Sequence, residues 1–227
     1  MEDFIFMNAP TELAHDHGLA MDRMYRRQRH IYDASRRFYL LGRNEMLRNL
    51  SAMPGQSILE IGCGTGRNLG LAAKLYPATS LFGIDISNEM LKTAQANLSS
   101  AEVVQRVELA QGDATNFISQ SCFQKQTFDR VYFSYTLSMV QDWQKAIAHA
   151  ITVLGDQGEL HIVDFGQCEN WPAPFKRLMF RWLSLFDVAP RQDLQVVLEA
   201  LAQKHNLKLV FKRSFSGYVW HAVLTPN

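Results

Sequence analysis

A glycine-dense turn between Glu60 and Gly66, with the sequence Glu-Ile-Gly-Cys-Gly-Thr-Gly, is the part of this chain best suited to hold a ligand. It follows the apolar run 57–59 and precedes a helix-like segment that begins at Arg67. Glycines let a backbone turn tightly and lie against a nucleotide without Cβ clashes. The dinucleotide fingerprint G-x-G-x-x-G would need a glycine at position 67. The spacing therefore disfavours a nicotinamide or flavin and favours a ligand without a pyrophosphate.

Three carboxylates stand at or near the ends of expected strands. Glu60 closes the first strand, Asp85 closes the second, and Asp113 follows the third. Asp85 comes 23 positions after Gly62, close to the ~20 expected of an acid that accepts the hydroxyls of a ribose. Each acid taken alone also fits a helix N-cap or a solvated turn. Together with the glycine loop, in this order, they indicate a nucleoside site.

Alternating strands and helices position these residues. We expect strands at 57–61, 80–85, 103–110, 128–134 and 158–165, helices at 67–76, 87–98 and 142–153, and then a helix at 191–204 and strands at 207–214 and 218–224. Ser87 is the expected N-cap of the second helix. This alternation predicts an α/β fold with a parallel sheet covered by helices on both faces, and the last two strands can form an antiparallel hairpin at one edge.

The segments that flank this core are unusual. Between Arg23 and Arg43 there are seven arginines and one acid, a local charge of +6 in a chain of net charge +1. Residues 20–41 have the pattern of a basic amphipathic helix. A second stretch, 171–186, mixes Trp, Phe and Leu with Lys and Arg. Both patterns are typical of elements that contact an anionic membrane surface, although the first also fits docking to the domain and the second also fits a substrate lid or a dimer contact.

Composition narrows the remaining classes. A chain of 227 residues with 47% hydrophobic and 20% charged residues fits one globular domain. It has no apolar run long enough to span a bilayer and no secretion signal at its start. Its three cysteines are far apart, so we expect neither a disulfide framework nor a metal site, and the expected location is the cytoplasm.

From about residue 57 onward the chain resembles the class I S-adenosylmethionine-dependent methyltransferases. The resemblance is carried by the glycine loop, Asp85, Asp113, the run 128–135 and the late hairpin 207–224. It implies a Rossmann-like sheet of seven strands, mostly parallel with a C-terminal antiparallel hairpin, and S-adenosylmethionine as cofactor, with S-adenosylhomocysteine as product. The expected cofactor-binding residues are Tyr32, Arg43, Glu60, Gly62, Gly64, Gly66, Asp85, Ile86, Met90, Asp113, Ala114 and Ser134.

Within this set, Arg43 is the expected cation for the cofactor carboxylate, because it follows a turn just before the core. Tyr32 is a second candidate at that end, by resemblance to Tyr-Asp pairs in small-molecule methyltransferases. Tyr135 lies at the end of the fourth strand, where the resemblance places the methyl acceptor, so Tyr135 and Tyr32 are the expected catalytic residues. His161 and His221 are possible bases, but a lone strand histidine is more often packed.

The N-terminal run from Met21 to Asp33 and the continuation through Arg43 resemble the bacterial diacylglyceryl-homoserine N-methyltransferases of betaine-lipid synthesis. With the core motifs and the ending 217–221, Gly-Tyr-Val-Trp-His, this similarity extends over about residues 20–224. It implies an N-terminal cap over residues 1–50, a methyltransferase domain over 51–227 with a substrate or membrane segment at 166–190, and threefold methylation of a homoserine amine. An arginine would meet the carboxylate of this substrate, and aromatic faces would accept the growing quaternary ammonium. The expected substrate residues are Tyr25, Arg36, Tyr39, Trp143, Phe165 and Trp171.

Other acceptors stay open at this point. They include phosphatidylethanolamine, a quinone and another small molecule, and a non-catalytic S-adenosylmethionine-binding module is a further alternative; a nicotinamide dehydrogenase is remote. Nucleic acid is not expected, because the residues after the fourth strand, 134–137, are Ser-Tyr-Thr-Leu and lack the Asn/Asp-Pro-Pro-aromatic signature of adenine-N6 methyltransferases. The expected partner is a lipid or small-molecule amine, with peripheral contact to the inner membrane.

Overall fold

A computed structural model describes residues 40–227 of the chain. The N-terminal arginine-rich helix expected over 20–41, and with it Tyr25, Tyr32, Arg36 and Tyr39, lies almost wholly outside the described residues. These four assignments stay predictions.

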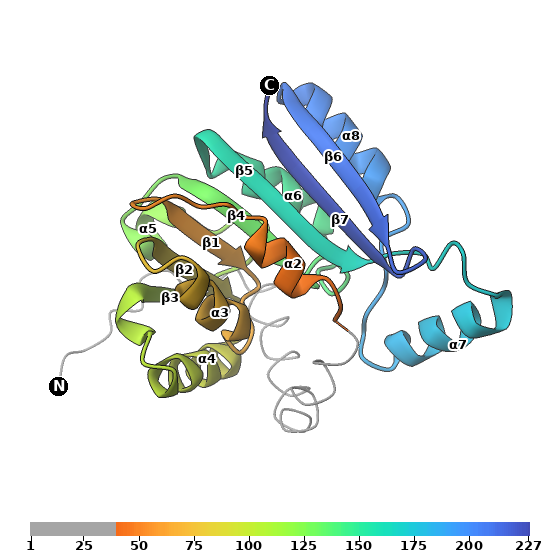
Figure 1. The fold of residues 1–227 in the computed structure, drawn as a ribbon, viewed down its shortest axis with the longest axis horizontal. Coiled ribbons are helices and arrows are strands. Elements are labelled where there is room, and N and C mark those ends of the chain that lie inside the picture. Colours follow the sequence, from red (N-terminus) through yellow and green to blue (C-terminus); the bar gives the residue numbers. More distant parts are fainter. Residues whose placement is uncertain (1–39) are drawn as a thin grey trace.

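The described part is built around one seven-stranded sheet with the order β3-β2-β1-β4-β5-β7-β6 (Figure 1). The strands are β1 (Ser57–Ile61), β2 (Ser80–Asp85), β3 (Val107–Gln111), β4 (Phe128–Ser134), β5 (Leu154–Phe165), β6 (Leu207–Ser214) and β7 (Val219–Pro226). The first five pair in parallel, and β7 pairs antiparallel with both β5 and β6. The expected fold, including the C-terminal hairpin, is confirmed.

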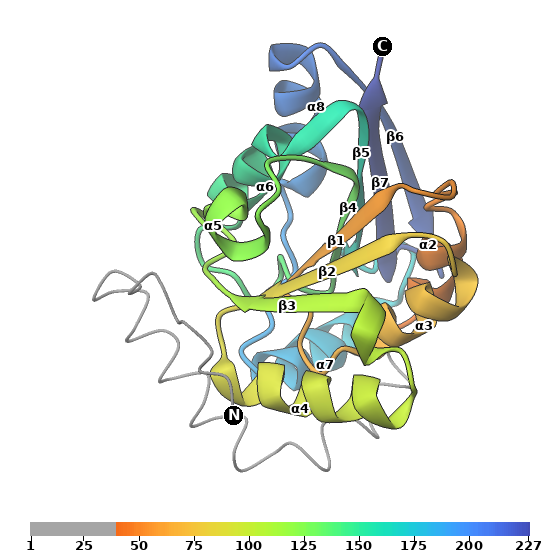
Figure 2. The ribbon, with the colours of Figure 1, turned by 90° about the vertical axis from the view of Figure 1, so that its left-hand side faces the viewer.

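Helices cover both faces of this sheet (Figure 2). They are α2 (Arg43–Arg48), α3 (Arg67–Leu75), α4 (Asn88–Ser100), α5 (Ser119–Phe123), α6 (Trp143–Thr152), α7 (Ala173–Ser184) and α8 (Leu194–Lys204). Successive side chains of a strand point to opposite faces of the sheet. On one face, Leu59 and Ile61 of β1 pack in a core with α6 and α8. On the other face, Ile58 of β1 packs in a second core with α2 and α3. Burial on both faces explains why the central strands are continuous apolar runs.

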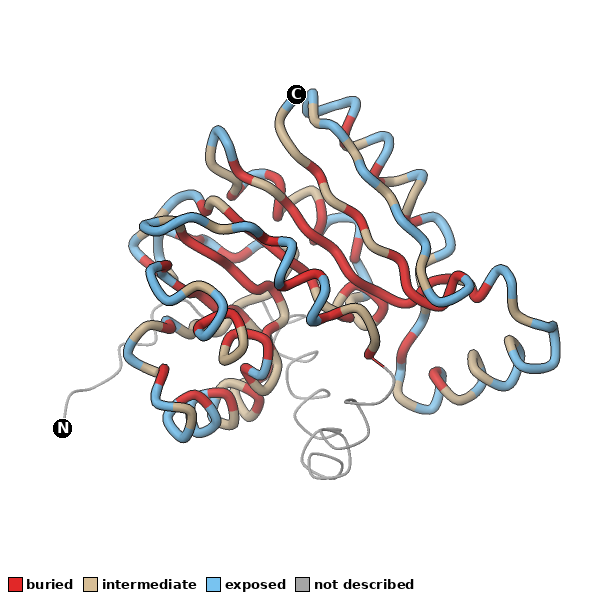
Figure 3. The backbone as a smooth tube through the Cα atoms, viewed as in Figure 1, coloured by how far each residue is buried: buried red, intermediate tan, exposed pale blue. Residues whose placement is uncertain are grey.

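Buried residues concentrate in the middle strands, as Figure 3 shows. All five residues of β1 are buried, and β5 ends at Phe165 with six consecutive buried residues. The carboxyl ends of β1 to β5 lie at one edge of the sheet, because these strands are parallel. In open α/β sheets this edge is where ligands bind.

Several elements differ from the sequence prediction. The third strand starts at Val107, not at 103, because α4 continues to Ser100 and a short 3₁₀ turn (Val104–Arg106) follows. The backbone N–H of Val103 bonds to the Leu98 carbonyl, which ends α4 and removes Val103 from the sheet. Helix α5 was not predicted, β5 starts four residues early, and α8 starts three residues late. Ser87 is confirmed as the N-cap of α4, since its hydroxyl accepts from the Met90 N–H at 3.2 Å.

The segment after β5 forms an amphipathic helix, α7, that extends past the carboxyl edge of the sheet (Figure 1). Within residues 40–227, no helix combines the length and apolar character needed to cross a bilayer.

Candidate functional site

The glycine loop leaves β1 at the carboxyl edge and turns directly into α3. The N–H groups of Gly62 and Cys63 both bond to the Ile84 carbonyl of β2, at 2.8 and 3.0 Å. Gly62, Gly64 and Gly66 have φ values of +75°, +53° and +73°, which L side chains rarely adopt. A Cβ at Gly62 would overlap the Thr136 methyl group and lie 2.7 Å from its Oγ1. The loop is thus held against the end of β4 with no room for a side chain.

Glu60, the last acid before the loop, is fully buried. Asn68 Nδ2 of α3 donates to its Oε1 at 2.7 Å, whereas Oε2 has no hydrogen-bond partner within the part of the chain that the structure describes. Burial raises the pKa of Glu60 to about 8, against opposing effects of Asn68, the nearby Tyr132 hydroxyl and Arg43. The Tyr132 hydroxyl is close enough to act on this charge but does not have hydrogen-bond geometry. An unused carboxylate oxygen beside the loop is suited to meet a ligand ammonium.

The pKa of Glu60 predicts a pH-dependent stability. A carboxyl group with a pKa of about 8 when folded and 4.5 when unfolded makes the ligand-free protein lose stability as pH rises from about 4.5 to about 8. Glu60→Gln keeps an acceptor for Asn68 and removes this titration. We expect Glu60→Gln to exceed the wild type in free energy of unfolding by on the order of 3–5 kcal/mol above pH 8, with a difference that shrinks toward pH 4.5.

Urea unfolding at several pH values measures this difference. Glu108→Gln, at an exposed glutamate of β3, is the matched control and should stay parallel to the wild type. A pH-independent difference for Glu60→Gln would show that Glu60 does not titrate in this window.

Asp85 ends β2 and organises the loop opposite it. Its Oδ2 accepts from the Gly64 N–H at 2.8 Å, and its Oδ1 accepts from the Ser87 N–H at 2.9 Å. The Asp85 side chain is half-buried at the carboxyl end of β2. Asp113, after β3, is also half-buried, and its Oδ1 accepts from the N–H and the hydroxyl of Thr115, both at 2.8 Å. Both acids therefore have structural roles in their turns as well as the positions expected for ribose and adenine contacts.

Arg43 begins α2 and is buried, with its Nε donating to the Leu40 carbonyl at 3.1 Å. Its charge lowers the pKa of both Glu60 and Tyr135, in each case against a larger effect of burial, so the guanidinium lies near the ends of β1 and β4. Gly42, just before it, has a φ of +76°, and a Cβ there would lie 2.7 Å from the His221 ring. The close approach of Gly42 to the His221 ring thus places the Arg43 guanidinium at the site, although Arg43 belongs to a helix outside the sheet.

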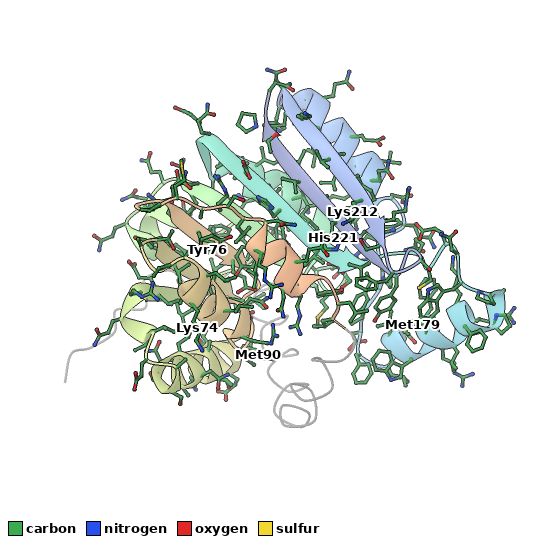
Figure 4. All side chains as sticks on the ribbon, in the orientation of Figure 1. Lys74, Tyr76, Met90, Met179, Lys212 and His221 are labelled. Carbon is green, nitrogen blue, oxygen red and sulfur yellow. The ribbon has the colours of Figure 1, made fainter. Side chains whose placement is uncertain are left out.

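These groups fit S-adenosylmethionine. The loop leaves backbone space for the amino-acid end, Glu60 offers a buried carboxylate to its ammonium, and Asp85 and Asp113 lie at the ends of the next two strands. The remaining predicted cofactor residues also lie at this edge: Ile86 and Met90 at the start of α4, Ala114 beside Asp113, and Ser134 at the end of β4. Figure 4 labels Met90 there. The Ser134 hydroxyl is buried without a partner among residues 40–227.

A row of aromatic side chains runs from Tyr135 across the ends of β4, β5 and β7. The ring centroids of Tyr135 and Phe165 are 4.6 Å apart, those of Phe165 and Tyr218 are 5.8 Å apart, and Trp171 stacks on Tyr218 at 5.7 Å. The structure thus brings together Tyr135, Phe165 and Trp171 as predicted, and adds Tyr218. Sequence reasoning did not assign Tyr218 to the site, although Tyr218 belongs to the run 217–221 at the end of the resemblance.

Tyr135 itself is strained and already engaged. Its φ is +58°, in a region that non-glycine residues seldom occupy and that often marks functional sites. Its hydroxyl donates to the Leu41 carbonyl at 2.6 Å, so it holds the segment that carries Arg43. Burial raises the pKa of Tyr135 far above its usual range. Tyr135 is therefore better placed to orient a substrate than to accept its proton.

Asp164 is a buried acid next to this row. It accepts from the Ser138 N–H at 3.1 Å and from the Phe165 N–H at 2.8 Å. Burial raises its pKa to about 6, with opposing effects of Ser138, Phe165 and Arg191. Arg191 bonds to the carbonyls of Leu137 and Val140 at 2.9 and 2.7 Å. These bonds connect the loop after β4 to the segment after α7. Both of these segments therefore fix the end of the site next to Tyr135, where the methyl acceptor is expected; this end is called the acceptor side.

Three other candidates do not join the site. Trp143, predicted as a substrate residue, is packed in the core with α6 and α8, whereas Tyr135, Phe165 and Trp171 belong to the core on the other side of the sheet, so this assignment is corrected. His161 is buried in β5, and its Nε2 pairs with Glu159 Oε2 at 2.9 Å. His221 lies in β7 beside Lys212 (Figure 4), and burial lowers its pKa. The His161 ring is thus engaged by Glu159, and the His221 ring packs against Gly42.

Comparisons with known proteins agree with this geometry. The profile of a methyltransferase domain matches residues 53–212. A demethylmenaquinone methyltransferase of Desulfitobacterium hafniense (strain Y51) is 30% identical over 126 residues, covering 55% of this chain and 48% of that protein. The rRNA N(6)-adenosine-methyltransferase metl-5 of Caenorhabditis elegans is 36% identical over 85 residues, covering 37% and 39%. The chain thus spans about half the length of these relatives or less.

Solved structures share the fold. A SAM-dependent methyltransferase from Aquifex aeolicus superposes with a TM-score of 0.62 at 15% identity, over 85% of this chain and 93% of that one. Phosphoethanolamine N-methyltransferase 2 of Haemonchus contortus, in complex with S-adenosyl-L-methionine, gives a TM-score of 0.64 at 18% identity, over 82% of this chain and 52% of that one. The domain match covers well over half of the chain, so the protein belongs to the methyltransferase-domain family of S-adenosylmethionine-dependent enzymes.

Proposed function

We propose that this protein transfers methyl groups from S-adenosylmethionine to the homoserine amine of diacylglyceryl-homoserine, three times in succession, to form a betaine lipid. The observation that carries the proposal is the aromatic row Tyr135–Phe165–Tyr218–Trp171 next to the buried Arg43. Aromatic faces accept a quaternary ammonium that has no N–H left to donate, with about 0.5–2 kcal/mol from each ring. Arg43 supplies positive charge at the same edge, where either the cofactor or the substrate carboxylate would bind. The resemblance of the arginine- and tyrosine-rich N-terminal sequence points to the same substrate.

In this proposal each residue of the site has a distinct role in binding the cofactor or orienting the substrate. S-adenosylmethionine would supply an electrophilic methyl group on a sulfonium. The glycine loop and Glu60 would hold its amino-acid end, and Asp85 and Asp113 would hold the ribose and adenine. Tyr135 would orient the attacking amine along the line of transfer, and such alignment alone can contribute roughly 7–11 kcal/mol to the rate. Tyr32, Tyr25, Tyr39 and Arg36 would complete the site from the N-terminal cap.

Tyr135→Phe tests the acceptor-side role. The substitution removes the hydroxyl that would orient the amine, together with its hydrogen bond to the Leu41 carbonyl, worth about 0.5–1.5 kcal/mol, and leaves the ring in the aromatic row. We expect kcat to fall about 3- to 10-fold while the Kd for S-adenosylhomocysteine changes less than twofold. Calorimetric titration and initial-rate assays measure the two quantities.

Tyr76→Phe is the matched control, because Tyr76 donates a similar hydrogen bond to the Leu47 carbonyl at 2.7 Å on the outer side of α2 (Figure 4). It should leave kcat unchanged. A Tyr135→Phe variant with weakened cofactor binding and normal kcat would place Tyr135 on the donor side instead.

The substrate is tested with methyl-labelled S-adenosylmethionine and a total lipid extract, followed by mass spectrometry of the labelled species. The proposal expects label in mono-, di- and trimethylated diacylglyceryl-homoserine. Label only in a water-soluble fraction would contradict it. Binding of the cofactor without turnover on any extract would indicate a regulatory module.

A quinone is the second candidate, because demethylmenaquinone methyltransferases are among the relatives, including one of Lactobacillus johnsonii that is 27% identical over 149 residues. Quinone and phosphatidylethanolamine products would appear in the same experiment at distinct masses. All three acceptors are membrane lipids, so each agrees with the proposed place of the protein at the cytoplasmic face of the inner membrane.

A further inference from the structure

The outer face of α7 is apolar and exposed. Leu185, Leu178 and Phe175 have 71%, 67% and 61% of their surface exposed, and all three lie within eleven residues of chain. The opposite face of the helix packs on the body, where Leu183 is buried and Met179 is partly buried (Figure 4). Figure 3 shows the helix as largely exposed beyond the edge of the sheet. A monomeric protein seldom presents such a cluster of large apolar side chains without a function for it.

Positive charge surrounds this face. Helix α7 contains Lys176, Arg177 and Arg181 and no acid, so its charge is +3. Lys176 lies over the Phe180 ring at 5.5 Å, and neither arginine has an ion-pair partner among the residues that the structure describes. Basic groups next to exposed Phe and Leu match the chemistry of an anionic bilayer surface, where the apolar groups enter the acyl boundary and the cations meet lipid phosphates. A protein partner of this helix would instead need a groove that is both apolar and acidic.

The helix is joined firmly to the site. The loop between β5 and α7 bonds to the β6–β7 turn through three backbone bonds: Gly166 N–H to the Tyr218 carbonyl at 2.8 Å, Cys168 N–H to Gly217 at 3.0 Å and Asn170 N–H to Ser216 at 3.3 Å. Gly166 and Gly217 approach so closely that a Cβ on Gly166 would overlap the Gly217 carbonyl.

A side-chain clamp strengthens the same junction. Glu169 Oε1 accepts from Trp220 Nε1 at 2.9 Å and pairs with Arg213 Nε at 3.1 Å. At its far end the helix returns through Ala189, whose N–H bonds to the Ser138 carbonyl at 2.9 Å. Because both ends are tied to strand ends at the carboxyl edge, a contact made by α7 fixes the orientation of the whole site.

The β6–β7 turn adds to the same surface. Phe215, at this turn, is 52% exposed, and the turn is hydrogen-bonded to the loop that leads into α7. Trp171, which ends that loop, stacks on Tyr218, the outermost member of the aromatic row. The exposed apolar residues and the acceptor side of the site therefore lie at one end of the molecule.

We infer that α7 and Phe215 form a docking surface for an anionic lipid bilayer and that this contact turns the carboxyl edge of the sheet, with the partly exposed Trp171 at the outer end of the aromatic row, toward the lipid headgroups. The inference rests on the proposed function only for the identity of the headgroup. Binding to a bilayer is a separate property of the same edge, and it requires no methyl acceptor in the membrane.

Vesicle flotation tests the docking surface, with phosphatidylcholine vesicles that contain or lack phosphatidylglycerol and hold no methyl acceptor. The full chain should float with the anionic vesicles and much less with the neutral ones. Arg177→Glu with Arg181→Glu should lower the partition coefficient at least about 25-fold, since each basic residue contributes about fivefold. Phe175→Ser with Leu178→Ser should lower it about tenfold or more.

Matched controls separate docking from general effects. Lys204→Glu with Lys208→Glu makes the same change in net charge at exposed lysines of α8 and β6, and Val196→Ser with Val210→Ser removes exposed apolar groups from the same two elements. Both control variants should bind vesicles like the wild type. All variants should bind S-adenosylhomocysteine with the wild-type Kd, which reports that the core is folded.

Three results would overturn the inference. The first is equal flotation with neutral and anionic vesicles, and the second is an equal loss of vesicle binding in the α7 variants and their control variants. The third is a wild-type protein that does not float and sediments as a dimer, which the α7 variants convert to a monomer. The last result would assign α7 to a second copy of the chain. Vesicle binding without labelled lipid in the methyl-transfer assay would contradict the proposed substrate and leave the docking surface standing.

Discussion

Replacing Asp85 with alanine is expected to weaken binding of S-adenosylhomocysteine at least about 100-fold. The carboxylate has two structural bonds, from the N–H groups of Gly64 and Ser87, and it faces the position proposed for the ribose. Hydrogen bonds to a charged group contribute about 1.5–3 kcal/mol each, so losing the ribose contacts and the bond that shapes the loop costs about 3–5 kcal/mol. Isothermal titration calorimetry measures the change directly.

Two further variants sharpen this result. Asp85→Asn keeps one acceptor oxygen for the Gly64 N–H and should lose less affinity than Asp85→Ala. Asp142→Ala removes an exposed acid at the start of α6 that pairs with Lys145, and it should bind the ligand normally. Wild-type affinity in Asp85→Ala would show that the end of β2 is not part of the cofactor site.

Replacing Gly62 with alanine is expected to lower the free energy of unfolding by about 2–5 kcal/mol and to abolish measurable ligand binding. A φ of +75° costs an L side chain roughly 1–2 kcal/mol, and the new methyl group would overlap the Thr136 side chain, which adds about 1–3 kcal/mol. Relief of the clash moves the loop away from β4 and so displaces Gly64 from Asp85. Urea unfolding and calorimetry measure the two losses.

Gly55→Ala is the matched control for backbone strain. Gly55 has a φ of +84° and open space where a Cβ would lie, so alanine there should cost only the roughly 1–2 kcal/mol of strain and leave binding intact. Adding Thr136→Ala to Gly62→Ala removes the overlapping atoms and should recover part of the stability. An equal loss for Gly55→Ala and Gly62→Ala would show that Thr136 does not confine the loop.

The parts of the fold that the sequence predicted well are those whose pattern is local. β1, β2 and β4 have the predicted bounds because each is a short apolar run closed by a polar or turn residue. The start of β3 was wrong because Val103 and Val104 suit a strand by type, whereas α4 extends far enough that the chain must turn there before it reaches the sheet. The short helix α5 has too few residues to show a period.

The clustering of the acids proposed to bind the cofactor was predictable for a similar reason. In a parallel sheet the residue that ends each strand arrives at one edge, so Glu60, Asp85 and Asp113 follow from strand positions alone. The acceptor side depends on which side chains cross from other elements. The sequence placed Trp143 with Tyr135 and Phe165, but α6 turns Trp143 into the other core, and the antiparallel return of β7 brings Tyr218 instead.

The sequence by itself determined the family, the glycine loop and the α/β class of the sheet with its C-terminal hairpin, because each is encoded by residues adjacent in the chain. Only the tertiary structure decided that the Glu60 carboxylate is buried with an oxygen unpaired among the described residues, that the Tyr135 hydroxyl is already held by Leu41, and that α7 is tied at both ends to the acceptor side. The burial of a side chain and the partner of its polar group depend on contacts between segments that are distant in the sequence. For Tyr135 and Leu41, 94 positions apart, no local pattern carries that information.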